Sequence, residues 1–430
     1  MGVTPSQLVR RSKTMKGPTI SDLDSQSNEL SQVTSTQNPL HDRNFYIIVS
    51  LTLIEIMGGP TIGPILPELS KVFAVSPSEI QLVMTAFFLP IGIATPILGI
   101  VTDRIGVRKV LIPSLLLFAI AGSSCAFAGD FQTLIRWRFL QGLGSASLNL
   151  ISLTLISTIY RGKALTLAMS IQVSAIGAST AIYPIIGGVL AGFSWRYPFL
   201  LNTIAFPLLM LVLMVLKLPR QQSGSQNSSI KLYLQKVWQS INNSTVLGLL
   251  LVVGLMFLIQ SGPFITYIPI LAGANFGASG LFIGLILASM SISLGLVASQ
   301  LGRLTRSTSE ITLIKAAFAI AAIALAMIPF INSAGLLFVP SILFGAALGL
   351  AIPASQEMLA KLAAGDTRAG FMAVNVSVQS LGIGLGPLMA GIFAGVWGMS
   401  GVFWVTAGLA VAALVLFHLL LSQGGSSKSS

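Results

Sequence analysis

The chain has 430 residues, of which 54% are hydrophobic and 8% are charged, and its formal net charge is +12. A soluble domain normally carries about 25% charged residues, so this chain lacks the charges needed to cover a solvated surface and fits a lipid environment instead. Its basic residues lie in short clusters between long apolar runs, as in the cytoplasmic loops of membrane proteins, and this distribution argues against nucleic-acid binding.

The first 43 residues are polar, which predicts a disordered cytoplasmic tail at 1–43. Beyond it, twelve segments reach the roughly 20 mostly apolar residues that a membrane-spanning helix needs. In the first half they cover residues 45–69, 79–101, 110–128, 133–158, 165–192 and 197–217. In the second half they cover residues 245–269, 278–301, 312–331, 335–360, 370–396 and 399–421. We therefore expect an all-α membrane protein of twelve transmembrane helices, built as two six-helix bundles at 44–217 and 245–421 and followed by a C-terminal tail at 422–430.

The longest internal loop, residues 218–244, separates the two sets of six spans. Its second part repeats apolar residues with helical spacing, at Ile230, Leu234, Val237 and Ile241. This pattern fits a short helix lying on the cytoplasmic membrane surface, and it fits a partly ordered linker equally well.

The basic residues also predict the orientation. An even number of spans places both termini on one side of the membrane. Of the 24 Lys and Arg residues, 20 lie in the tails or in loops on that side, the others being Lys71, Arg136, Arg138 and Arg196. By the positive-inside rule this side is the cytoplasm, so we expect a multi-pass protein of the cell (inner) membrane with both termini cytoplasmic.

The two halves repeat each other. A small-residue pattern after the second span recurs after the eighth with an offset of 196: Gly99, Asp103 and Gly106 match Gly295, Ser299 and Gly302. A second pattern recurs with an offset of 203: Pro184 and Gly188 match Pro387 and Gly391. Parallel repeats of this kind imply a pseudo-twofold axis along the membrane normal and a substrate cavity between the halves.

The loop between the second and third spans reads GIVTDRIGVRKVLI over residues 99–112. Its glycines permit a sharp turn and close helix approach, and its opposite charges can pair at the cytoplasmic rim. We interpret the loop as a conformational latch formed by Gly99, Asp103, Arg104, Gly106, Arg108 and Lys109. The alternative is a basic loop that only sets the orientation.

This loop resembles the signature loop of the major facilitator superfamily. The stretches LIRWRFLQGLGSA at 134–146 and WRYPFLLN at 195–202 are similar to that family's fourth-span motif and sixth-span opening. The resemblance covers about 45–421 and implies a two-bundle transporter, similar to the drug/proton antiporter branch.

Glu55 and Arg138 are charged residues inside predicted spans, where charges are costly and mark functional sites. Glu55 is in the middle of the first span, with Thr52, Gly59 and Gly63 predicted on the same helix face. Its carboxyl group suits proton binding and release, or binding of a cationic substrate, and a structural pairing is the alternative. Arg138 is expected to face a hydrated cavity or a carboxylate. The family resemblance implies that Arg138 takes part in proton coupling, and a structural ion pair is the alternative.

The fifth and eleventh spans carry a proline among small residues, over 179–188 and 382–391. These stretches resemble the antiporter motif of the superfamily, with Ser179 and Tyr183 in place of glycines in the first copy. Ordinary close helix packing explains the same residues. The motif residues are Pro184, Gly187, Gly188, Gly386, Pro387 and Gly391.

Uncharged polar side chains in the spans are candidates for lining the substrate cavity. In the fourth span Arg138, Gln141, Ser145, Asn149 and Ser152 recur with helical spacing and predict one polar stripe. The candidates are Thr52, Gln141, Ser145, Asn149, Gln172, Gln260, Tyr267, Asn375 and Gln379. Each of them fits an interhelical hydrogen bond as well. Glu357 and Lys361 are expected to pair at the cytoplasmic rim instead.

The function that these features predict is proton-coupled efflux of small apolar organic compounds, such as drugs, by alternating access. An importer or exporter of a specific metabolite, such as a sugar or an amino acid, is the alternative. With one cysteine and two histidines, the chain has no catalytic constellation or metal ligand set, so we expect no enzyme activity and no cofactor. The expected partners are the substrate, protons and the lipid bilayer, with the protein acting as a monomer.

Overall fold

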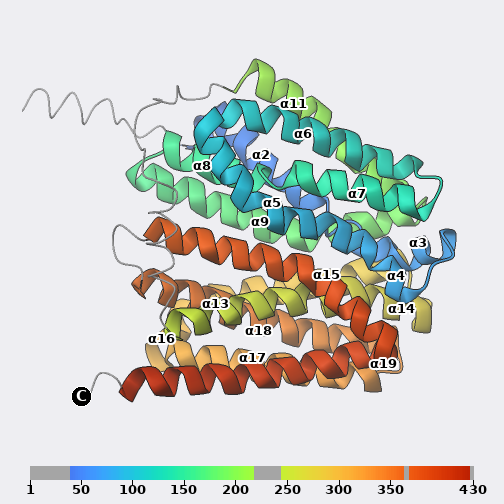
Figure 1. Cartoon of the computed structure of the whole chain (residues 1–430), viewed down its shortest axis with the longest axis vertical. Helices are drawn as coiled ribbons and strands as arrows, with labels where there is room; N and C mark the ends of the chain where they lie inside the picture. The colour runs from blue at the N-terminus through green and yellow to red at the C-terminus, as the bar shows by residue number, and fades with distance from the viewer. Residues whose placement is uncertain (1–38, 217–243, 363–367, 427–430) are drawn as a thin grey trace, which may run out of the picture.

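The structure is a computed structural model that describes residues 39–216, 244–362 and 368–426. Within these ranges the chain is helical and forms two bundles, which lie one above the other in Figure 1. The predicted interfacial segment at 230–241 and most of the N-terminal tail lie outside the described residues.

The N-terminal bundle contains six passes along the chain. Its helices are α2 (Arg43–Met57), α3 (Leu66–Val72), α4 (Pro77–Ile80), α5 (Leu82–Ile105), α6 (Val107–Ser124), α7 (Phe131–Ser145), α8 (Leu148–Ile159), α9 (Gly162–Ala191), α10 (Tyr197–Leu200) and α11 (Ala205–Met214). The pairs α2/α3, α4/α5, α7/α8 and α10/α11 each form one pass across the bundle.

The C-terminal bundle repeats this arrangement. It contains α13 (Ser244–Ile259), a π-helix (Gln260–Tyr267), α14 (Ile268–Phe276), α15 (Gly280–Ser299), α16 (Leu301–Ser307), α17 (Glu310–Met327), α18 (Phe338–Leu362) and α19 (Arg368–Ser426). Here α13, the π-helix and α14 form the seventh pass of the chain.

Among the described residues, ten helices are long and apolar enough to cross a membrane by themselves. One of them, within α19, contains two passes, because Gly398 has a φ of 72° and reverses the chain, as Figure 1 shows. The remaining pass is Arg43–Val72, which a turn at 58–62 interrupts. The prediction of twelve spans in two bundles is therefore confirmed.

Each bundle has its own apolar core. In the N-terminal bundle Phe45, Phe87 and Phe118 are at most 1% exposed. In the C-terminal bundle the rings of Phe264 and Phe344 stack with centroids 3.9 Å apart. A third cluster joins residues of the N-terminal bundle to Ile270 of α14, so the two cores meet at one end of the helices.

We call the end that carries α3, α4 and α14 the closed end, because the bundles are in contact there. The hydroxyl of Tyr267 donates to the carbonyl of Pro77 over 3.3 Å. Between another pair of helices, Ser291 of α15 donates to the carbonyl of Thr180 in α9 over 3.1 Å. Both hydrogen bonds cross from one bundle to the other.

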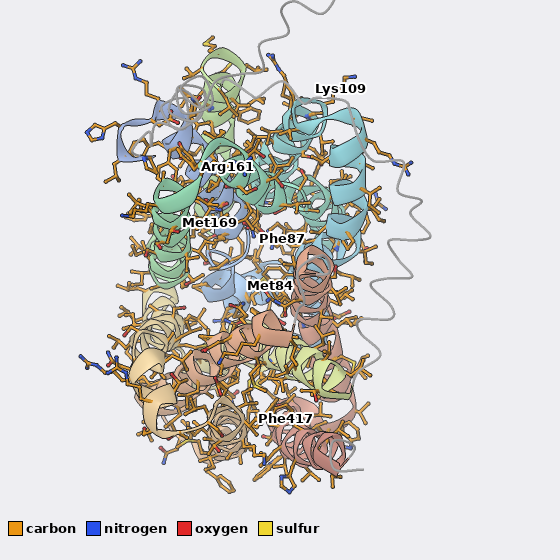
Figure 2. All side chains as sticks on the ribbon, turned by 90° about the vertical axis from the view of Figure 1, so that its left-hand side faces the viewer. Met84, Phe87, Lys109, Arg161, Met169 and Phe417 are labelled. Atoms are coloured by element: carbon orange, nitrogen blue, oxygen red, sulfur yellow. The ribbon has the colours of Figure 1, made fainter. Side chains whose placement is uncertain are left out.

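Beyond this contact the bundles separate. A Cβ built on Gly177 of α9 or on Gly295 of α15 would have no neighbour within 4 Å. We call this opposite end, which carries the α5–α6 turn and α16, the open end. Figure 2 looks along the helices from the open end, and the buried residues Met84 and Phe87 of α5 are labelled near the middle of the view.

The first span differs from the expected single helix. Helix α2 ends at Met57 and a turn follows over residues 58–62, where Pro60 lacks the N–H that a continuing helix would need. The shared face predicted for Thr52, Glu55, Gly59 and Gly63 is therefore wrong beyond Glu55. The last helix continues beyond the expected span, to Ser426.

Candidate functional site

Glu55 lies in the last turn of α2 and is half-buried. Within the described part of the chain, no hydrogen bond or ion pair reaches its carboxylate. The turn after α2 packs against α5, since a Cβ on Gly58 or Gly59 would lie 2.6 Å from the ring of Phe87 or Phe88 respectively. The helix end that carries this uncompensated carboxylate is thus packed against two aromatic rings of α5.

Arg138 of α7 is fully buried within the same bundle. Its Nη1 donates to the carbonyl of Gly58 over 2.8 Å and its Nε donates to the carbonyl of Val83 over 3.1 Å. Its guanidinium carbon lies 4.3 Å from the ring centre of Phe87. The expectation that Arg138 faces a cavity or a carboxylate is wrong: backbone carbonyls and an aromatic face stabilise the cation.

A chain of side-chain amides extends from Arg138 across the bundle. Nη1 of Arg138 also donates to Oε1 of Gln141 over 2.8 Å, and Nε2 of Gln141 donates to Oδ1 of Asn202 over 2.9 Å. Asn202 in turn donates to the carbonyl of Phe199 over 2.7 Å. The Nη2 atom of Arg138 is buried without a hydrogen-bond partner among the described residues. This network ties the α2 turn to α5, α7 and the 3₁₀ turn Leu201–Ile204 that precedes α11.

A second buried polar cluster joins α2, α8 and α9. Nε2 of Gln172 donates to Oγ1 of Thr52 over 3.0 Å and to Oγ of Ser152 over 3.1 Å. The Thr52 hydroxyl also lies 3.4 Å from Oδ1 of Asn149. Thr52 occupies the turn of α2 before Glu55, so this cluster fixes the helix that carries the carboxylate.

The structure divides the candidate cavity residues into two groups. Thr52, Gln141, Ser145, Gln172, Tyr267 and Asn375 are at most 1% exposed. They lie between helices rather than along an accessible surface in this conformation, and their role in lining a substrate cavity stays a prediction. The half-buried candidates are Asn149, Gln260 and Gln379. The polar stripe of the fourth span is interrupted where α7 ends and α8 begins, and it faces into the bundle.

The π-helix at Gln260–Tyr267 is a feature that the sequence analysis did not identify. It begins at Gln260 and contains Pro263, which cannot donate a backbone hydrogen bond. The hydroxyl of Ser261 compensates locally by donating to the carbonyl of Leu258, five residues before Pro263, over 3.3 Å. Such widened turns occur frequently at functional sites, and Pro263 was the sequence signal for an irregular turn there.

The predicted latch lies at the open end between α5 and α6. Gly106 has a φ of 96°, a conformation that favours glycine and produces the sharp turn between the helices. Arg104, Arg108 and Lys109 are exposed, and the position of the Asp103 side chain is outside the description. A Cβ on Gly99 would lie 3.1 Å from Leu150 of α8. The role of these residues as a latch stays a prediction.

The proline and glycine motifs bring helix backbones together. Gly188 of α9 faces the backbone of Gly280 in α15, and Gly284 of α15 faces the carbonyl of Pro184. Both contacts join the two bundles at the closed end.

In the eleventh span, Gly386 packs against the start of the π-helix, within the C-terminal bundle. By contrast, a Cβ on Gly391 would lie 2.5 Å from Nε2 of Gln81 in the other bundle. Close packing therefore accounts for the geometry of these residues, and their part in antiport remains a prediction.

The sequence profile of the Major Facilitator Superfamily matches residues 48–339 and, in a second overlapping match, 272–429. Together these matches extend over most of the chain. The chain belongs to the Major Facilitator Superfamily. As a member of this superfamily it is a multi-pass membrane protein and a secondary transporter of a small-molecule substrate, and it is not an enzyme.

Among curated members of the superfamily, the bacillibactin exporter of Bacillus subtilis is 28% identical over 164 residues, 36% of this chain and 41% of the exporter. MdtD of Salmonella paratyphi B, a protein named for multidrug resistance, is 30% identical over 139 residues, 32% of this chain and 29% of MdtD. The matches thus cover less than half of either relative.

Solved structures of superfamily transporters share the fold over most of their length. A bacterial homologue of the human lysosomal transporter Spinster, in an inward-facing and occupied conformation, superposes with a TM-score of 0.73 at 15% identity. The comparison covers 88% of this chain and 96% of the homologue. The nucleoside transporter NupG matches with a TM-score of 0.68 at 14% identity, over 87% of this chain and 99% of NupG. At these identities the likeness describes the fold.

Proposed function

We propose that this transporter exports small, mostly apolar organic compounds in exchange for protons. The observation that carries the proposal is the carboxylate of Glu55, which is half-buried inside a membrane-spanning bundle and has no partner among the described residues. A group in this position can gain and lose a proton as its surroundings alternate between two aqueous phases. The names of the bacillibactin exporter and of MdtD are consistent with export.

The orientation follows from the distribution of basic residues. In this proposal the open end faces the cytoplasm, because 20 of the 24 Lys and Arg residues lie in tails or loops on that side. The conformation is then inward-facing, and substrate enters between the bundles from the cytoplasm. Rocking of the bundles opens the closed end, while the 99–112 loop at the opposite end acts as the latch. Both termini are cytoplasmic in this arrangement, and the transporter works as a monomer.

The half-buried polar groups of the spans favour an apolar substrate. Glu55 is the half-buried carboxylate at mid-span, and the half-buried amides Asn149, Gln260 and Gln379 add hydrogen-bonding capacity without charge. Arg138 is buried, and its guanidinium donates hydrogen bonds to backbone carbonyls. Phosphorylated metabolites would need accessible cationic side chains, and this set supplies none.

Arg138 contributes to proton coupling indirectly in this scheme. It donates to the carbonyl of Gly58, three residues after Glu55, and so holds the end of α2 that carries the carboxylate. A proton bound at Glu55 changes the charge of this helix end, and the hydrogen-bonded network transmits that change to α5 and α7. Arg138 is therefore a positioning residue in the proposal.

Transport in everted membrane vesicles tests the proposal. A proton gradient is imposed, and the accumulation of a panel of lipophilic fluorescent dyes is followed for the wild type and for Glu55→Gln. We expect Glu55→Gln to abolish the accumulation of any transported dye that the proton gradient drives. Substrate exchange in the absence of a gradient should remain, because glutamine keeps the shape of the glutamate side chain and cannot release a proton.

Glu357→Gln is the matched control. Glu357 pairs with Lys361 over 2.8 Å at the open end, as the sequence predicted, and this exposed pair contributes little to stability. The control is expected to transport like the wild type. If Glu55→Gln accumulates dye at the wild-type rate and with the wild-type pH dependence, Glu55 does not couple transport to protons and the proposal is wrong.

A further inference from the structure

A cationic pair lies at the junction of α17 and α19, on the part of the C-terminal bundle farthest from the other bundle. The Nζ atom of Lys315 lies 2.8 Å from Nδ1 of His418. Lys315 is half-buried and His418 is exposed. Phe417, the residue before His418, is buried in the C-terminal core and is labelled in the lower part of that bundle in Figure 2.

The pair lies near the open end of the spanning helices. Lys315 follows the start of α17 at Glu310 by five residues, which corresponds to about 7.5 Å along a helix. His418 is followed by Leu419, Leu420 and Leu421 and then by a polar stretch that begins at Ser422. Both side chains are therefore at the depth where the hydrocarbon region of a bilayer gives way to headgroups.

Lys315 has no acidic partner among the described residues. The ion pairs there join Lys361 to Glu310 and to Glu357, so the acids nearest in sequence are already neutralised by another lysine. The Lys315 ammonium uses one of its three N–H donors toward the imidazole. Two donors of the ammonium and the second imidazole nitrogen remain available to an anion.

The surface around the pair is apolar. Val411, Val415 and Leu416 of α19 are 49%, 52% and 42% exposed. In a spanning bundle such side chains contact acyl chains. A cationic pair above an apolar surface matches a phospholipid, which has an anionic headgroup above its hydrocarbon tails.

We propose that Lys315 and His418 form a binding site for the phosphate of an anionic phospholipid in the leaflet at the open end. The phosphate oxygens accept from the Lys315 ammonium and from the imidazole, while the acyl chains cover the exposed side chains of α19. This site is separate from the space between the bundles and does not depend on the proposed proton coupling.

Native mass spectrometry of the detergent-purified full chain tests the site. The protein is titrated with phosphatidylglycerol and, separately, with phosphatidylcholine, which carries the same phosphate without net charge. We expect the wild type to retain phosphatidylglycerol preferentially. Lys315→Gln should weaken its binding about fivefold, the contribution of one cation near an anionic lipid, and His418→Gln should weaken it as well. Lys315→Arg should preserve it.

Lys109→Gln is the matched control, because Lys109 is an exposed basic residue at the same end of the other bundle. It should leave the preference unchanged. Melting temperatures measured in detergent without added lipid identify any variant that fails to fold. If Lys315→Gln fails to fold, Lys315→Arg is compared with the wild type instead. The proposal is overturned if Lys315→Gln keeps the wild-type preference, if Lys109→Gln loses as much binding, or if soluble glycerol phosphate competes at the same concentration as the lipid.

Discussion

Small residues bring the backbones of the two bundles into contact at the closed end, and enlarging one of them should change which end is open. Gly188 of α9 packs directly on Gly280 and Leu281 at the start of α15. The bundles must lose this contact when the closed end opens, because it joins helices from opposite halves. A side chain too large for this contact therefore raises the free energy of the conformation in which the closed end is closed, relative to the conformation in which it is open.

The size of the penalty follows from the geometry. A Cβ on Gly188 would lie 2.8 Å from Cα of Leu281 and 2.6 Å from the carbonyl carbon of Gly280. Carbon atoms pack at about 3.5–4.0 Å, so Gly188→Ala needs α9 and α15 to separate by about 1 Å. These neighbours are backbone atoms and cannot rotate away. Overpacking of this kind costs about 1–3 kcal/mol, which shifts a two-state equilibrium by about 5- to 150-fold.

Distances between spin labels on the two bundles measure this shift. The single cysteine, Cys125, is first replaced by alanine. Labels at Phe193 and Asn275, both exposed at the closed end, report opening there, and labels at Arg161 and Arg306 report the open end. We expect Gly188→Ala to lengthen the closed-end distance and to shorten the open-end distance.

Gly177→Ala is the matched control in the same helix, since a Cβ there meets nothing within 4 Å. It should reproduce the parent distance distributions. If Gly188→Ala gives the same distributions as Gly177→Ala, the close approach of α9 and α15 does not hold the closed end together, and the reasoning from packing is refuted.

Two further substitutions test the N-terminal bundle. Arg138→Met should lower the melting temperature in detergent, because the carbonyls of Gly58 and Val83 each lose a buried donor. Each lost donor costs about 1–3 kcal/mol of stability. An unchanged melting temperature would contradict the assignment of Arg138 as a positioning residue. Asp130 lies outside the spans and accepts from the backbone and hydroxyl of Thr133, which lowers the pKa of its carboxyl group. When the pKa of a carboxyl group is lower in the folded state than in the unfolded state, its ionised form stabilises the fold. This stabilisation is fully present above the unfolded-state pKa and is lost as the pH falls through the folded-state pKa. Asp130→Ala should therefore be less stable than the wild type at neutral pH and nearly equal to it once the pH is below the folded-state pKa of Asp130. A stability difference that grows on acidification would contradict the hydrogen-bond explanation.

The sequence was sufficient to predict the number of spans and their division into two bundles. Whether a segment spans the membrane depends on the free energy of transferring that segment from water to lipid. A window of about 20 residues is therefore enough to predict a span. The stretches 316–356 and 369–427 contain no charged residue, and each holds membrane-spanning helices in the structure. Glu55 was identifiable for the same reason, since a carboxylate within an apolar run is rare whatever surrounds it.

Other features depended on partners that are remote in the chain. Arg138 is stabilised by the carbonyls of Gly58 and Val83, which are 80 and 55 residues away, and a backbone carbonyl carries no residue-specific signal. The polar side chains Gln172 and Asn149 looked equivalent in sequence, yet Gln172 is buried against Thr52 and Ser152 while Asn149 is half-buried. Helical periodicity gives the face on which a side chain lies, but it does not give the helix that packs there.

The separation of the bundles at one end was likewise decided by tertiary structure. Gly188 and Gly177 lie on the same helix and have the same local propensity, but one meets the backbone of α15 and the other meets no atom within 4 Å. Composition and periodicity thus determined that this chain crosses the membrane as two six-helix bundles. The conformation, and with it the accessibility of each polar group, was decided by contacts between helices, because the free energy of those contacts depends on the positions of both partners.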